Sequence, residues 1–146
     1  MFITFEGPDG GGKTTQAARL CGFLQQRGLP VLLTREPGGT TIGEMIREVV
    51  LSARGESIYP STELLLFNAA RAQIVGTVIR PALASGSIVI CDRFADSTRA
   101  YQGCAGGLDL SVVETVISLA TGGLNPDLTI LVDLLVALGL ERRSNS

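Results

Sequence analysis

The chain has 146 residues, of which 45% are hydrophobic and 18% charged, and its formal net charge is −2 at pH 7. These values are typical of one globular domain with a single core, and the absence of a basic run argues against a nucleic-acid-binding surface. Histidine is absent, which excludes acid–base catalysis and triads that depend on imidazole. No apolar stretch reaches membrane-spanning length, and the N-terminus enters a predicted strand directly, so we expect neither a transmembrane helix nor a signal peptide. The odd number of cysteines, Cys21, Cys91 and Cys104, without metal-ligand spacing, indicates reduced thiols in a cytoplasmic protein.

The first predicted elements surround a glycine-rich loop. The apolar, β-prone run Phe2–Phe5 predicts a strand, and Thr14 opens an amphipathic helix that stops before Gly28. Between them, Gly7–Thr14 matches the pattern GxxxxGK[ST], in which backbone N–H groups surround phosphate oxygens at a helix N-terminus. Lys13 is the single lysine among 12 basic residues. It stands at the position where a compact ammonium group suits bound phosphates. The residues expected to bind nucleotide phosphates are Gly7, Gly10, Gly11, Gly12, Lys13, Thr14 and Thr15.

The rest of the chain alternates predicted strands and helices. Strands are expected at 31–34, 88–92 and 128–132, each as a near-continuous apolar run, and those at 31–34 and 88–92 are expected to be buried. Helices are expected at 42–51, about 61–85 with a bend at Pro81, about 110–120, and 135–143. The connecting segments include a loop rich in proline and glycine at 35–40, a polar break at 52–59 and a glycine-rich loop at 103–107.

This alternation predicts an α/β fold with a parallel sheet covered on both faces, a P-loop three-layer α/β/α sandwich. We expect residues 1–146 to form a single domain. The polar loops follow the C-terminal ends of the strands, where open α/β sheets bind ligands.

The residues at the end of the third predicted strand distinguish between classes of nucleotide-binding protein. A GTPase motif N-K-x-D does not occur, and Arg93 follows Asp92 where an oligomeric ATPase motor usually has glutamate. An Asp-Arg pair instead suits an enzyme that holds a second, phosphate-bearing substrate. Asp92 would polarise the acceptor or help to hold Mg²⁺. The alternative is an ordinary Walker B carboxylate without a role toward the acceptor.

Five motifs, in order, resemble the thymidylate kinase family over essentially the whole chain. They are Phe5-Glu6-Gly7 running into Asp9-Gly10 and Gly12–Gln16, then Arg35–Thr40, then Leu66-Phe67 with Ala69 and Arg71, then Asp92-Arg93-Phe94, then Asp96–Thr98 with Ala100–Gly103. The segment Asn125–Thr129 before the last strand also fits this family. The resemblance implies phosphoryl transfer from ATP to dTMP, with Mg²⁺ as cofactor.

The resemblance also assigns roles to individual residues. Phe67 and Arg71, four apart on one predicted helix face, would read the thymine base by stacking and hydrogen bonding. Without the resemblance, Phe67 would more simply be a core residue. Arg93 and Arg47 would clamp the monophosphate, although a solvated helix face is the alternative for Arg47. Asp9 would meet the sugar 3′-hydroxyl.

The remaining assignments complete the expected site. Tyr101 would fill the space of a ribose 2′-hydroxyl, and Ser97 and Thr98 would contact the base. Glu36 and Gln102 complete the dTMP-binding set. The expected catalytic residues are Lys13, Asp92 and Arg93, and the expected metal ligands are Thr14 and Asp92.

Two departures from the family pattern bear on activity. Cys104–Gly107 lacks the arginine common after Tyr-Gln-Gly, and members of the family continue beyond Ser146 into an arginine-bearing lid and a further strand. We therefore expect a C-terminally truncated domain that binds dTMP, binds ATP weakly and turns over poorly. Arg142 and Arg143 could approach the site, but a role in capping the last helix explains them more simply.

Two other functions stay open at this point. The chain could be a kinase for another nucleotide or a nucleoside, although a nucleoside would leave Arg47 and Arg93 without a phosphate. Alternatively, without a lid it could be a non-catalytic nucleotide-binding fragment. The oligomeric state is open too, with a homodimer as the candidate that the family suggests.

Overall fold

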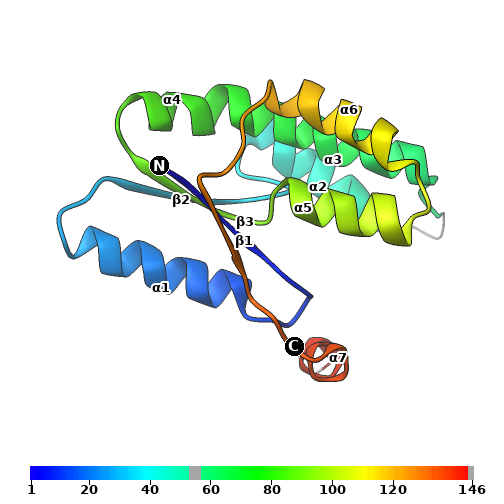
Figure 1. Ribbon diagram of the computed structural model, residues 1–146, viewed down its shortest axis with the longest axis horizontal. Coiled ribbons are helices and arrows are strands. Elements are labelled where there is room, and N and C mark those ends of the chain that lie inside the picture. The colour runs from blue at the N-terminus through cyan, green and yellow to red at the C-terminus, as the bar shows by residue number, and fades with distance from the viewer. Residues whose placement is uncertain (53–56, 145–146) are drawn as a thin grey trace.

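A parallel four-stranded sheet with helices on both faces forms the protein (Figure 1). The computed structural model describes residues 1–52 and 57–144. The strands are β1 (Phe2–Glu6), β2 (Val31–Arg35), β3 (Ile88–Asp92) and β4 (Leu128–Leu131), in the order β2-β3-β1-β4. All the pairings are parallel, so the predicted α/β fold is confirmed.

The helices divide between the two faces of this sheet. The α-helices are α1 (Lys13–Gln25), α2 (Thr41–Leu51), α3 (Pro60–Ile74), α4 (Arg80–Ala84), α5 (Ala95–Thr98), α6 (Leu110–Thr121) and α7 (Val136–Ser144), and two π-helical segments are η1 (Val75–Ile79) and η2 (Arg99–Ala105). Figure 1 shows α1 on one side of the sheet and α3, α4 and α6 on the other, with α7 near the C-terminal ends of β1 and β4. None of the described helices is both long enough and apolar enough to cross a membrane.

Strand β1 supplies the core on both faces, because successive side chains of a strand point to opposite sides. Phe2 faces α3 and packs edge-on against Phe94, with ring centroids 5.0 Å apart and planes at 86°. Ile3 and Phe5 belong to the other cluster, with Ala17 of α1. This two-sided packing fixes the C-terminal end of β1, where the phosphate-binding loop begins.

The edge strands are more exposed than the sequence predicted. The central strands β1 and β3 are buried, but β2 is half-buried and β4 is mostly exposed, with Leu131 68% exposed. The expectation that the strand at 31–34 is buried is therefore wrong. The physical reason is position, since β2 and β4 each pair along one side alone within the described sheet.

The helical boundaries also differ from the predicted ones. The single helix expected at about 61–85 is divided into α3, η1 and α4, and the π-helical turns of η1 lie just before Pro81, which has no N–H for the regular hydrogen bond.

Residues 95–105 were not predicted to be helical, yet they form α5 and η2. Part of the expected loop at 103–107 is therefore helical. A Cβ on Gly103 would lie 2.6 Å from Leu110 Cδ2, so this glycine permits close packing on α6 rather than a turn. Of the predicted polar break at 52–59, residues 53–56 lie outside the described residues.

Candidate active site

A cavity of about 1090 Å³ opens at the C-terminal ends of the strands. Its walls come from the loop after β1, the loop after β2, helix α3 and the segment after β3. The predicted site residues that line it are Asp9, Gly10, Gly12, Lys13, Thr14, Thr15, Glu36, Arg47, Phe67, Arg71, Asp92, Arg93, Ser97, Thr98, Tyr101 and Gln102. Two predicted residues, Gly7 and Gly11, do not line the cavity. Both lie in the loop between β1 and α1.

The loop between β1 and α1 contains glycines with positive φ, as expected for a loop that surrounds phosphates. Gly12 caps α1 with φ 89°, a left-handed torsion that favours glycine. Gly7 has φ 140°, and a Cβ there would overlap the carbonyl oxygen of Val132. The first residues of α1, Lys13, Thr14 and Thr15, line the cavity, and the N–H groups at a helix N-terminus favour an anion.

Lys13 lies at the base of this loop, 6% exposed. Its Nζ donates a hydrogen bond to the Pro8 carbonyl at 2.7 Å. Burial lowers the pKa of Lys13 from its usual value, and the nearby guanidinium of Arg93 lowers it further. A bound polyphosphate would supply the negative charge that a buried ammonium needs.

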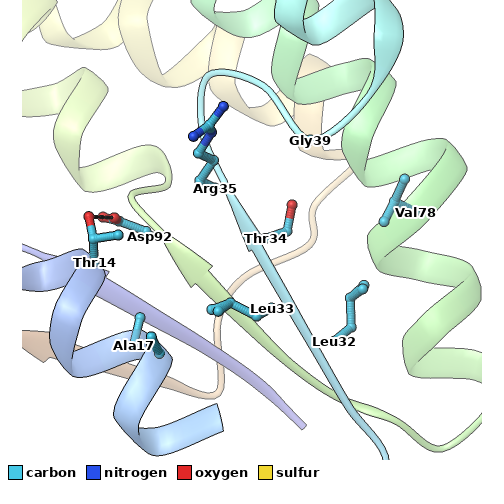
Figure 2. A pocket seen from close by; sticks show the side chains of 10 residues that line it. Thr14, Ala17, Leu32, Leu33, Thr34, Arg35, Gly39, Val78 and Asp92 are labelled. Atoms are coloured by element: carbon cyan, nitrogen blue, oxygen red, sulfur yellow. Dashed lines mark hydrogen bonds between the residues drawn. The ribbon is translucent and has the colours of Figure 1, made fainter. Parts of the chain in front are cut away.

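Thr14 and Asp92 meet directly at the other side of the loop. The Thr14 hydroxyl donates to Asp92 Oδ2 at 2.5 Å, as Figure 2 shows. The buried Asp92 Oδ1 has no hydrogen-bond partner among the described residues. One hydroxyl and one carboxylate with unused capacity fit Mg²⁺, which takes few protein ligands and completes its shell with phosphates and water.

A smaller groove of about 370 Å³ adjoins Thr14 and Asp92 along β2. Figure 2 shows Leu33 on the side of α1 and Leu32 on the side of Val78. Its walls are mainly apolar, in contrast to the charged cavity beside it.

Arg71 occupies the centre of a buried polar network at the α3 side of the cavity. It is 2% exposed, and its Nε donates to Glu36 Oε2 at 2.7 Å. Nη1 donates to Asn68 Oδ1 at 3.1 Å. Nη2 donates to the Phe94 carbonyl and to the Thr98 hydroxyl, both at 3.0 Å. The guanidinium thus joins α3, the loop after β2 and the segment after β3 beside Phe67.

Glu36, the partner of Arg71, is 4% exposed. Burial raises the pKa of Glu36 from 4.5 to about 7, although Arg71 opposes that rise. Its Oε1 has no hydrogen-bond partner within the described part of the chain. The sequence alone marked Glu36 as a site residue but not as half of a buried ion pair.

The loop after β2 is held by charged residues of α2. Glu44, in the first turn of α2, accepts hydrogen bonds from the Gly39 N–H at 2.9 Å and from Arg35 Nη2 at 3.1 Å. The Gly39 bond is the main cause of a lowered pKa for Glu44. Arg47 donates to the Pro37 carbonyl at 2.8 Å and lines the cavity. This hydrogen bond and the place of Arg47 in the cavity wall favour the binding role over a solvated helix face, and that role stays a prediction.

Arg93, directly after β3, has φ 71°, which is unusual for a residue other than glycine. Its guanidinium forms an ion pair with Asp9 and donates to the Ser97 hydroxyl at 2.9 Å. The guanidinium carbon also lies 5.5 Å from the ring centroid of Tyr101. Arg93 therefore bridges the phosphate-binding loop and the helix that carries Tyr101.

Several cavity residues were not predicted from the sequence. Pro37, Leu51, Glu63 and Phe94 line the cavity, and Glu63 Oε2 accepts a hydrogen bond from Gln102 at 3.0 Å. Glu63 lies in the first turn of α3, and its pairing with Gln102 joins residues that are distant in the sequence. Arg142 also lines the cavity, and its Nη1 lies 3.4 Å from the Gly10 carbonyl. The side chain of Arg143 lies outside what the structure describes.

Comparison with known proteins identifies the family of the chain. The thymidylate kinase family model matches residues 5–146. The chain is 54% identical to a thymidylate kinase of Roseiflexus sp. over 98% of its own length and 63% of that relative, and 57% identical to one of Thermomicrobium roseum over 97% and 67%. The first relatives are thus matched over 61–63% of their length. The crystal structure of thymidylate kinase from Ehrlichia chaffeensis superposes with a TM-score of 0.86 at 41% identity, covering 99% of this chain and 82% of that one. The chain belongs to the thymidylate kinase family.

Proposed function

We propose that this site transfers a phosphoryl group from ATP to dTMP, giving ADP and dTDP. The observation that carries the proposal is the meeting, in one cavity, of the phosphate-binding loop with Lys13, the Asp92-Arg93 pair, and Phe67 beside Arg71. Family membership supports the same reaction.

In phosphoryl transfer the protein acts mainly by positioning the reactants and stabilising charge, because its side chains carry out little covalent chemistry. The N–H groups before α1 and the Lys13 ammonium would hold the β- and γ-phosphates of ATP. Arg93, supported by Arg47, would hold the dTMP phosphate in line with the γ-phosphate. Both arginines already have their guanidinium groups fixed by hydrogen bonds, to Ser97 and to the Pro37 carbonyl, which limits the entropy lost on binding.

Thr14 and Asp92 are the residues that would hold Mg²⁺ with ATP. The metal would neutralise charge that develops on the transferred group. The unpartnered oxygen of Asp92 supports this assignment. Asp92 would serve the metal and the acceptor side at once, since it is the last residue of β3, hydrogen-bonded to Thr14 and directly before Arg93.

At the other end of the cavity, Phe67 would stack on thymine and Arg71, with Thr98, would hydrogen-bond the base. Asp9 would meet the 3′-hydroxyl, and Tyr101 would occupy the space of a 2′-hydroxyl. Tyr101 lines the cavity beside Arg93, and this position would keep the sugar between base and phosphate. The cytoplasmic location and a homodimer stay predictions.

A transfer assay with γ-labelled ATP and four acceptors, dTMP, dUMP, dGMP and thymidine, tests the proposal. We expect dTMP to be the preferred acceptor whatever the absolute rate. Preference for dGMP would indicate a kinase for another nucleotide, and preference for thymidine a nucleoside kinase. Binding of dTMP without transfer to any acceptor would support the non-catalytic alternative.

Replacing Phe67 with alanine should weaken dTMP binding by about 1–3 kcal/mol, the usual contribution of an aromatic ring stacked on a base. ATP binding should stay nearly intact, since the loop before α1 is built without Phe67. Isothermal titration of both nucleotides measures this. Phe23→Ala, which removes an exposed ring on α1, is the control and should change neither affinity. Equal losses for ATP and dTMP in Phe67→Ala would make Phe67 a core residue.

A further inference from the structure

Glu6, the last residue of β1, is a buried carboxylate without a role in the reaction described so far. It is 4% exposed and lies directly before the phosphate-binding loop. Its Oε1 accepts a hydrogen bond from the Phe94 N–H at 2.7 Å, and its Oε2 accepts one from the Ser97 hydroxyl at 2.5 Å. Both donors belong to the segment that begins with Arg93. A buried charge held in this way fixes its donors closely, because losing either bond leaves a polar group unsatisfied.

The direction of these hydrogen bonds links Glu6 to Arg93. The Ser97 hydroxyl has one proton, which it donates to Glu6. Its lone pairs then accept from Nη1 of Arg93 at 2.9 Å. The chain of donors therefore runs from Arg93 through Ser97 to Glu6, and the carboxylate's negative charge favours this direction.

Glu6 also supports the backbone that presents Arg93. With φ 71°, Arg93 has a conformation that residues other than glycine seldom adopt. It is held on each side, because the Arg93 N–H bonds the Phe5 carbonyl at 2.9 Å and the next N–H, of Phe94, bonds Glu6. One carboxylate thus supports both the main chain next to this arginine and, through Ser97, its guanidinium, which Asp9 and the Gly7 carbonyl also hold.

We propose that Glu6 is a positioning residue that sets Arg93, through Ser97, to receive the phosphate of the acceptor. This rests on the proposed function, in which Arg93 binds that phosphate. It also gives the Ser97 hydroxyl a role toward the phosphate end of the acceptor in place of the expected contact with the base.

The two roles of Ser97 predict different results when the acceptor lacks its phosphate. If Ser97 contacts the base, Ser97→Ala should weaken dTMP and thymidine alike. If Ser97 and Glu6 position Arg93, Ser97→Ala and Glu6→Gln should each weaken dTMP by about tenfold, the typical effect of losing one hydrogen bond to a charged group. Thymidine affinity should then change little, so the ratio of the two affinities falls. Ser97→Thr, which keeps a hydroxyl, should restore the ratio.

Isothermal titration of each variant with dTMP and thymidine measures this ratio, and circular dichroism establishes that each variant is folded. Asp127→Asn is the matched control, because Asp127 accepts the Phe2 N–H at 2.6 Å at the opposite end of β1, and its ratio should match the wild type. Equal losses for both ligands, or an unchanged ratio, would overturn the proposal. If the affinity ratio falls in Ser97→Ala but not in Glu6→Gln, the role proposed for Glu6 is wrong. If the wild-type chain itself does not prefer dTMP over thymidine, the proposed function fails, which is a distinct outcome.

Discussion

Replacing Lys13 with alanine is expected to weaken ATP binding by about ten- to a hundredfold while leaving dTMP affinity nearly unchanged. The estimate reflects the loss of charge-assisted hydrogen bonds from a buried ammonium to phosphate oxygens. Lys13 is nearly enclosed beneath the loop, so water cannot replace it fully in the variant. Titration with ATP and with dTMP in the presence of Mg²⁺ measures both effects.

Arg19→Ala is the control for Lys13→Ala, because it removes a positive charge from the exposed part of the same helix. It should leave both affinities at the wild-type level. An ATP affinity that survives in Lys13→Ala would show that the loop amides alone hold the phosphates, and a loss of dTMP affinity as large as that of ATP would show a general disruption of the site.

The second large effect concerns stability. Arg71→Met should lower the free energy of unfolding at pH 8 by about 3–5 kcal/mol, because removing one partner leaves the buried Glu36 carboxylate without its counter-charge. That is a large fraction of the roughly 5–15 kcal/mol of a typical domain. Arg99→Met breaks an exposed cluster with Glu114 and Asp96 and should cost less than about 1 kcal/mol. Urea unfolding of the three proteins gives the comparison.

The penalty for Arg71→Met should depend on pH. Because burial raises the pKa of Glu36 from 4.5 to about 7 in the folded protein, its contribution to stability is fully present below pH 4.5 and is lost as the pH rises through about 7. At pH 5 the folded variant can keep a neutral Glu36, so the penalty should be smaller there than at pH 8. A penalty that is equal at the two pH values would contradict a buried Glu36 with a raised pKa.

The sequence was most informative where local pattern and chemistry coincide. The glycines and Lys13 of the phosphate-binding loop depend on short-range spacing, and Phe67 and Arg71 share a helix face because they are four residues apart. Both groups line the cavity as expected. The parallel sheet likewise followed from alternating apolar runs.

What could not be predicted depends on contacts between distant segments. The pairing of Glu36 with Arg71 joins residues 35 positions apart, and the contact of Glu6 with Ser97 joins residues 91 apart. The hydrophobic periodicity of the sequence carries no information on such contacts. The π-helical turns of η1 and η2 were not predicted either; η1 lies just before Pro81, and η2 contains Gly103, which packs closely on Leu110 of α6.

The central claim is that the cavity holds a deoxynucleoside monophosphate with thymine at Phe67 and the phosphate at Arg93. Isothermal titration of this chain with dTMP and with thymidine tests it most directly, because the two ligands differ by the phosphate alone. We predict that dTMP binds at least about tenfold more tightly, the minimum expected from charge-assisted hydrogen bonds to Arg93 and Arg47, and that Arg93→Met removes most of this difference. Thymidine binding as tightly as dTMP, or a difference that persists in Arg93→Met, would contradict this placement of the acceptor.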